Sequence, residues 1–234
     1  MSLANDPRYP PVPTEALPMI RLHYAPGNAS FTVHALLREL HLPFELVRVD
    51  REHGAHKTPE YLKLNPNGLI PVFEDGDLVL YETAAICLHL VDTHPHAGLA
   101  PAVGSSQRAH FYKWLMWLTN TVQPRVIDLI YPHRLVDDGN TAGAAEVKRH
   151  AHTKLVACLQ QLDDQMASHG GPWLLGADYS VVDIYAWLMC RWTRNFGDRP
   201  ARSFPHLGPY LQRVLQRPAM QQTIAAEGLQ PPLV

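Results

Sequence analysis

Two neighbouring segments decide how this chain folds: Asn65-Pro66-Asn67-Gly68-Leu69-Ile70-Pro71-Val72 and Tyr81-Glu82-Thr83-Ala84-Ala85-Ile86. Proline has no N–H to give to a β-ladder, so a strand over 69–73 must carry Pro71 at an edge or in a special geometry such as a cis bond. A cis bond would turn the preceding backbone outward. Ile70 would then offer its N–H and C=O to an extended peptide, as an added strand does at a sheet edge.

The second segment supplies polar groups at the start of an apolar helix. Glu82 brings a carboxylate and Thr83 a hydroxyl, and the free N–H groups of a helix N-terminus attract an anion. The two segments together suit a ligand that carries an amine, a carboxylate and a peptide bond.

The composition is that of an ordinary globular protein. Of 234 residues, 46% are hydrophobic and 18% charged, and the formal net charge is -2. This balance gives no reason to expect nucleic acid or an anionic membrane as a partner. Residues 1–18 are polar and rich in proline, unlike an apolar signal core, and we expect a flexible leader there and a cytoplasmic protein.

Cysteine and histidine do not form a recognisable metal or disulfide pattern. The three cysteines, Cys87, Cys158 and Cys190, are far apart in helix-like apolar segments, which predicts buried structural thiols. The 14 histidines form short pairs without a third ligand at a known spacing, and HExxH is absent. We therefore expect no functional metal.

Periodicity divides the chain into a mixed half and a helical half. The order strand, helix, strand, helix, strand, strand, helix is predicted for the ranges 19–24, 30–41, 44–49, 59–64, 69–73, 78–81 and 83–94. Beyond a linker rich in proline and glycine, helical periods dominate, with a long helix over 106–135 that Pro124 should kink. Ser180-Val181-Val182-Asp183 predicts a capping box that opens a later helix.

This arrangement resembles the cytosolic glutathione S-transferases, and the resemblance covers residues 19 to about 226. It rests on the three motifs quoted above, which occur in the family's order and approximate spacing. It implies a thioredoxin-like, glutathione-binding domain over 19–97, an all-helical domain over 98–234 that lines the pocket for a small hydrophobic electrophile, and a homodimer with a role in detoxification.

Within the family, residues 24–30 (YAPGNAS) look most like the bacterial beta-type branch, which usually carries a cysteine where this chain has Ala29. Without that thiol the protein cannot form a mixed disulfide with glutathione at this position. The remaining chemistry is activation of the glutathione thiol itself. A free thiol has a pKa of about 8.5, and lowering it by about two units takes about 2.7 kcal/mol. A charge-assisted hydrogen bond supplies roughly 1.5–3 kcal/mol.

Three groups compete to donate that hydrogen bond. Ser30 follows the missing cysteine at the start of the first helix and is the first choice, although it could serve only as a helix cap. Tyr24 matches the catalytic phenol of the tyrosine-type branches but could be a half-buried aromatic. The Asn28 amide, or backbone donors alone, is the third option.

The resemblance also assigns the other contacts. Ile70 and Pro71 should hold the cysteinyl backbone of glutathione, and Glu82 and Thr83 its γ-glutamyl group. Family members often place a base where Leu69 stands, so His56 or Lys57 would bind the glycyl carboxylate. For the electrophile pocket the candidates are Tyr112, Trp117, Asn120 and Tyr131, whose pattern also fits a helix core.

Two further functions remain open at this point. The protein could bind glutathione or carry a ligand without turnover, because the cysteine and the base near Leu69 are both missing. It could also be a glutathione-dependent disulfide or peroxide reductase, or an isomerase.

Overall fold

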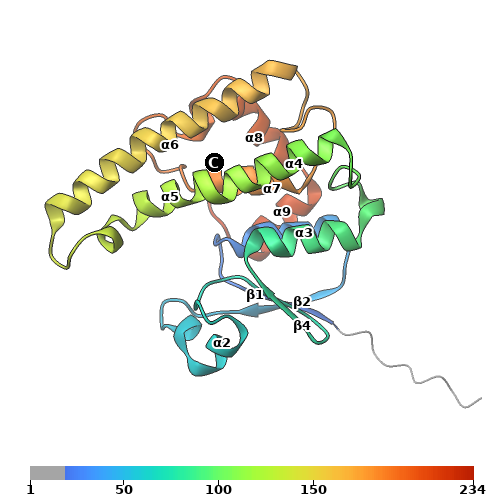
Figure 1. The fold of residues 1–234 in the computed structure, drawn as a ribbon, viewed down its shortest axis with the longest axis horizontal. Helices are drawn as coiled ribbons and strands as arrows, with labels where there is room; N and C mark the ends of the chain where they lie inside the picture. The colour runs from blue at the N-terminus through green and yellow to red at the C-terminus, as the bar shows by residue number, and fades with distance from the viewer. Residues whose placement is uncertain (1–18) are drawn as a thin grey trace, which may run out of the picture.

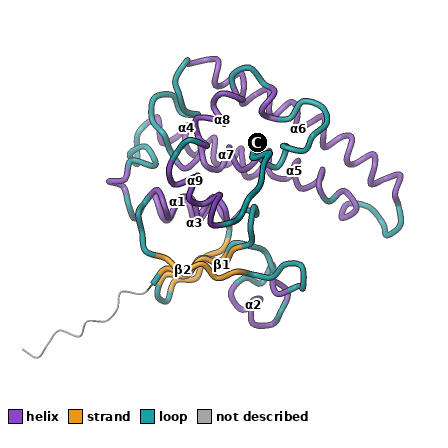
Figure 2. The backbone as a smooth tube through the Cα atoms, turned by 180° about the vertical axis from the view of Figure 1, so that it is seen from behind, coloured by secondary structure: helices purple, strands orange, loops and turns teal. Residues whose placement is uncertain are grey.

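The computed structural model describes residues 19–234, so the leader expected over 1–18 lies outside the described part. A four-stranded sheet with the order β2-β1-β3-β4 forms the base of the molecule (Figure 2). β1 (Ile20–Tyr24) pairs in parallel with β2 (Phe44–Arg48) and antiparallel with β3 (Val72–Asp75), which pairs with β4 (Leu78–Tyr81). The predicted order of strands and helices is confirmed, and the sheet with its helices is thioredoxin-like.

The start of β3 differs from the prediction by three residues, more than any boundary of the other strands. β3 begins at Val72 and not at Leu69. Pro71 cannot donate to the ladder, so regular pairing starts only after it. The Ile70–Pro71 peptide bond is cis, as expected from the sequence.

Three helices belong to the sheet. α1 (Ser30–Glu39) and α3 (Thr83–Thr93) lie between the sheet and the other helices, and α2 (Pro59–Leu64) lies beside the opposite face of the sheet (Figure 1). Residues 30–37 of α1 are all buried, because the sheet covers one side of the helix and the helical domain covers the other. α1 is therefore the element that joins the two halves.

The second half is helical, as predicted: α4 (Ser106–Trp117), α5 (Gln123–Ile130), α6 (Thr141–His169), α7 (Val181–Arg191), α8 (Leu207–Leu215) and α9 (Pro218–Ala226). The long helix expected over 106–135 is interrupted by a π-helical segment at 118–122, directly before Pro124, whose missing N–H breaks the regular ladder. Within residues 19–234, no helix is both long and apolar enough to cross a membrane.

The larger of two apolar clusters runs through both halves, and the smaller one lies beneath the loops of the first domain around Tyr61 and Ile70. Phe31 of α1 stacks on Trp187 of α7 with ring centroids 5.2 Å apart. At the end of α1, Glu39 accepts two hydrogen bonds from Arg217, at 2.6 and 2.7 Å. Such a forked pair fixes orientation as well as distance, so the two domains are held in one relative position.

The capping box at the start of α7 is confirmed. Asp183 is fully buried and accepts hydrogen bonds from the backbone N–H of Ser180 and of Leu174 and from the Tyr210 hydroxyl. Burial raises the pKa of Asp183 to about 6, while these donors act in the opposite direction.

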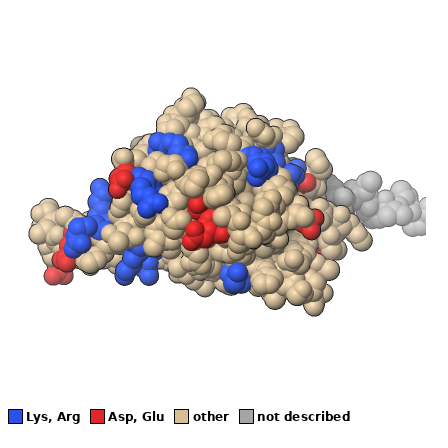
Figure 3. All heavy atoms as spheres, turned by 90° about the horizontal axis from the view of Figure 1, so that it is seen from above, with Lys and Arg blue, Asp and Glu red and all other residues tan. Residues whose placement is uncertain are grey.

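Charges of both signs are interspersed on the helical face (Figure 3). Lysine and arginine side chains form separate groups there, with uncharged surface and a cluster of acidic side chains between them. This face shows no extended basic stripe of the kind that binds nucleic acid.

We predict that Asp183→Ala lowers the free energy of unfolding by roughly 3 kcal/mol, because it leaves several buried donors without an acceptor. Urea denaturation at pH 7 measures the change. Asp178→Ala is the matched control, because Asp178 is exposed and lies just before the box. Equal stabilities of the two variants would contradict this role for Asp183.

Candidate functional site

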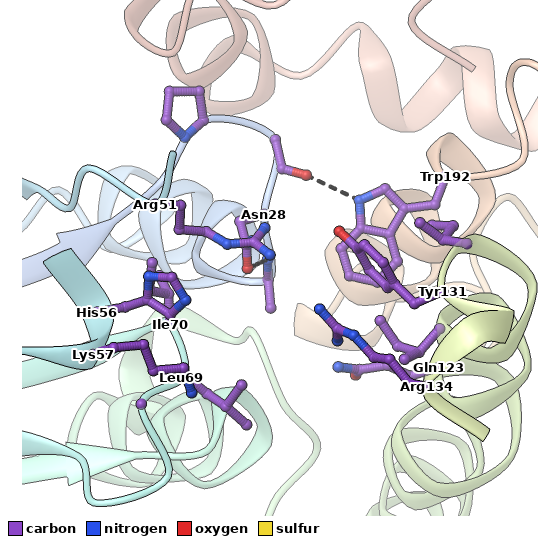
Figure 4. Close-up of a pocket in the computed structure, with 16 residues that line it drawn as sticks. Asn28, Arg51, His56, Lys57, Leu69, Ile70, Gln123, Tyr131, Arg134 and Trp192 are labelled. Carbon is purple, nitrogen blue, oxygen red and sulfur yellow. Dashed lines mark hydrogen bonds between the residues drawn. The ribbon is translucent and has the colours of Figure 1, made fainter. Parts of the chain in front are cut away.

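A cavity of about 510 Å³ lies where the loops of the first domain face α5 and the end of α7 (Figure 4). One wall comes from the loops after β1 and β2 and from the segment before β3, and the other from the helical domain. No aspartate or glutamate lines it; the lining residues are Pro26, Gly27, Asn28, Ala29, Arg51, His56, Lys57, Gly68, Leu69, Ile70, Gln123, Ile127, Ile130, Tyr131, Arg134 and Trp192.

The loop after β1 is a tight turn that the helical domain holds. Gly27 has φ +65°, which favours glycine, and the N–H of Asn28 binds the C=O of Ala25 at 3.1 Å. The N–H of Gly27 donates to Glu227 Oε2 at 2.8 Å, and its C=O accepts from Trp192 Nε1 at 2.9 Å. Both polar groups of one loop glycine are thus bound by residues far along the chain.

Of the three candidates for thiol activation, Asn28 is the one that the structure places in the cavity. Its side-chain oxygen accepts the N–H of Ala29 at 2.7 Å, which fixes the orientation of the amide. The amide nitrogen makes no hydrogen bond within residues 19–234, so two N–H donors remain for a ligand.

Ser30 and Tyr24 do not line the cavity. The Ser30 hydroxyl is fully buried and is occupied twice by Ala25, since it donates to the C=O at 3.2 Å and accepts from the N–H at 3.3 Å. The Tyr24 ring packs edge-on against His34. The geometry therefore favours Asn28 over the serine that ranked first from sequence, and the catalytic role itself stays a prediction.

A basic wall faces the cavity from the loop after β2. His56 and Lys57 lie there, as expected, and Arg51 joins them (Figure 4). Lys57 Nζ donates to the C=O of Asn67 at 3.3 Å. Burial, followed by the charges of Lys57 and Arg51, lowers the pKa of His56, so at pH 7 the positive charge of this wall comes from the lysine and the arginine. Arg51 was not predicted, although it stands in the same polar loop.

The segment before β3 presents unoccupied backbone. Tyr61 and Asn65 both donate to the C=O of Leu69, at 2.9 and 2.8 Å. Within residues 19–234, the N–H and C=O of Ile70 make no hydrogen bond, which leaves them available to an extended ligand, as the sequence suggested.

The two sequence motifs meet across the β3–β4 ladder. Val72 pairs with Tyr81, so Pro71 and Glu82, the next residues outward, are neighbours across the sheet. Glu82 has φ +72° and precedes α3, whose first residue Thr83 is buried. Glu82 and Thr83 do not line the cavity itself and lie beyond the Ile70 edge of it.

The helical wall contains one of the four residues predicted for it. Tyr131 lines the cavity, and Arg134 lies over its ring with the guanidinium carbon 4.0 Å from the centroid. Gln123 is also in this wall and accepts the Tyr185 hydroxyl at 2.6 Å. Gln123, Arg134 and Trp192 had no sequence signal that distinguished them from other residues of helices and loops.

Tyr112, Trp117 and Asn120 lie outside the cavity. Tyr112 and Asn120 are exposed elsewhere on the surface, and Trp117 packs edge-on against Trp114 with centroids 5.2 Å apart. These three residues therefore stand apart from this cavity, and their assignment to an electrophile pocket stays a prediction.

The cysteines are buried, as predicted, and none lines the cavity. Burial raises the pKa of the thiols of Cys87, Cys158 and Cys190. No group of three metal-ligating side chains occurs within residues 19–234.

We predict that the native protein reacts slowly with a disulfide reagent such as dithionitrobenzoate, because neutral buried thiols are poor nucleophiles. Absorbance of the released thiolate, compared with that from protein unfolded in urea, measures the difference. Rapid labelling of one native thiol would contradict this prediction.

Comparison with known proteins agrees with the fold. The family model described as glutathione S-transferase, N-terminal domain, matches residues 18–92, and the corresponding C-terminal domain model matches residues 132–226. Glutathione S-transferase 3 of Zea mays is 33% identical over 206 residues, covering 86% of this chain and 90% of that protein.

Two other relatives are informative about ligands and chemistry. The structure of a sphingomonad glutathione S-transferase complexed with glutathione is 32% identical, has a TM-score of 0.76, and is matched over 90% of this chain and 100% of its own. The disulfide-bond oxidoreductase YfcG of Escherichia coli is 27% identical over 221 residues, 88% of this chain and 94% of that protein. With two domain models that together match more than half of its residues, the chain belongs to the glutathione S-transferase family.

Proposed function

We propose that this glutathione transferase lowers the pKa of bound glutathione with the Asn28 amide and directs the thiolate at a small hydrophobic electrophile. The observation that carries the proposal is the position of Asn28: its amide N–H groups are without a partner in the described chain, at the start of α1 and in the wall of the cavity.

Glutathione fits the first-domain wall group by group. The open N–H and C=O of Ile70 suit the cysteinyl peptide, and Pro71 lies directly beside them. Arg51 and Lys57 suit the glycyl carboxylate, with His56 as a neutral neighbour. Beyond the Ile70 edge, Glu82 and Thr83 suit the γ-glutamyl amine and carboxylate.

The donors near Asn28 are sufficient for thiol activation. Besides the amide, the backbone N–H of Ser30 makes no hydrogen bond within residues 19–234, and it belongs to the first turn of α1. A hydrogen bond to a charged acceptor supplies roughly 1.5–3 kcal/mol and a helix N-terminus about 0.3–1 kcal/mol. Their sum covers the about 2.7 kcal/mol that a shift of about two pKa units requires.

Homodimeric assembly and a cytoplasmic role in detoxification are part of the same proposal. Large apolar side chains exposed on β4 and on α4 support self-association, since burying them against a second copy would remove apolar surface from water. They are Leu78, Val79, Tyr81, Tyr112 and Met116.

The central experiment is the rate of conjugation of glutathione with 1-chloro-2,4-dinitrobenzene across pH. We predict that Asn28→Ala raises the apparent pKa of kcat/KM by about one unit and lowers the rate at pH 6.5 by roughly fivefold, because it removes one donor to the thiolate. Asn195→Ala is the control, at an exposed position outside the cavity. An unchanged pH profile would remove Asn28 from the mechanism, and absence of any rate over buffer with several electrophiles would refute turnover.

We predict separately that Arg51→Gln and Lys57→Gln each weaken glutathione binding about three- to tenfold, since each removes a partly screened charge opposite a carboxylate. Isothermal titration calorimetry measures the dissociation constants. Lys63→Gln, an exposed lysine of α2, should have no effect. If all three variants bind alike, the glycyl carboxylate is held elsewhere.

The similarity to a disulfide-bond oxidoreductase favours glutathione-dependent disulfide reduction as a second candidate. No protein cysteine lines the cavity, so the attacking thiolate would again come from glutathione. Assays with 2-hydroxyethyl disulfide distinguish this activity from conjugation. Binding of glutathione without either activity would support a ligand-binding protein.

A further inference from the structure

We infer that the co-substrate of this site is an anion: a small apolar molecule with a carboxylate or an equivalent acidic group that Arg134 binds. This inference rests on the proposed function, because it concerns the half of the cavity that glutathione leaves open.

Both walls of the cavity carry positive charge. Arg51 and Lys57 stand on the first-domain wall and Arg134 on the opposite wall, and the lining contains no acidic residue (Figure 4). With glutathione in the proposed position, its glycyl carboxylate occupies the first wall and its γ-glutamyl group lies beyond Ile70. The positive charge of Arg134 then faces the space of the second substrate without an anion opposite it.

Arg134 is held in a way that suits anion binding. Its guanidinium lies over the Tyr131 ring, and within residues 19–234 the guanidinium N–H groups make no ion pair and no hydrogen bond, whereas the backbone N–H of Arg134 binds the C=O of Tyr131. Stacking uses the flat face of the guanidinium and leaves the N–H edge free for a carboxylate. Figure 4 shows the guanidinium directed from the helical wall toward the cavity.

Arg134 is itself exposed, and apolar side chains share the cavity lining with it; they indicate the character of the rest of the ligand. Leu69 and Ile130 are 57% and 43% exposed, and both line the cavity, together with Ile127. Side chains of this size left open to solvent on facing walls suit a flat apolar body between them. An aromatic or aliphatic acid combines this body with an anion.

The test compares a matched acid and amide, 4-nitrobenzoate and 4-nitrobenzamide, by calorimetry in the presence of saturating S-methylglutathione, which fills the first wall. We expect the acid to bind about fivefold more tightly at low ionic strength, with the preference decreasing as salt screens the charge. Arg134→Gln should abolish the preference. Arg149→Gln, an exposed arginine of α6 outside the cavity, should retain it.

Equal binding of acid and amide, or a preference that survives Arg134→Gln, would overturn the inference. Turnover is then measured with 4-chloro-3-nitrobenzoate and its amide, each rate divided by the uncatalysed rate with glutathione. Acid preference in binding with no turnover of either compound would refute the proposed conjugation while leaving the anion site intact. If S-methylglutathione does not bind, the affinities for the acid and the amide are compared without it. A preference for the acid that is lost in Arg134→Gln still supports the site, and a preference that is retained in Arg134→Gln contradicts it.

Discussion

The geometry of the cavity depends on the two hydrogen bonds that the helical domain makes to Gly27. Glu227 accepts the N–H of this glycine and Trp192 donates to its C=O. The second oxygen of Glu227 binds His34 of α1 at 2.9 Å, so one buried carboxylate connects the loop, the first helix and the end of α9. A buried network in which every polar group has a partner is rigid, because moving or removing one member leaves the others without a hydrogen bond. The network also fixes the position of Asn28, because Asn28 directly follows Gly27 in the loop.

The chemistry of the site follows from the residue at position 29, two positions after that glycine. At Ala29 the chain has a methyl group and no thiol, and its cysteines are buried elsewhere. The reactive sulfur must therefore belong to glutathione. In the proposed site the first domain supplies the backbone and charge for glutathione, whereas the helical domain supplies the opposite wall and holds the loop that carries Asn28.

Much of the fold could be predicted because its signals are local: turn residues, alternating strands, a capping box and a proline that cannot join a ladder. For the same reason Ile70, His56 and Lys57 could be expected beside one cavity, and their roles in binding stay predictions. The sequence could not show that the Ser30 hydroxyl is unavailable to a ligand. That hydroxyl is hydrogen-bonded to the backbone of Ala25, and the bond depends on the exact geometry of the turn between them. The helical wall could not be predicted either, since the π-helical segment at 118–122 rotates the residues that follow it.

We propose that the protein stabilises the thiolate of bound glutathione and that none of its own cysteines takes part in the reaction. Ultraviolet difference absorbance of the glutathione complex near 240 nm, titrated from pH 5 to 9 against the protein with S-methylglutathione, measures the pKa of the bound thiol directly. We predict a pKa about two units below the roughly 8.5 of a free thiol. A bound thiol that titrates as it does in solution would contradict it.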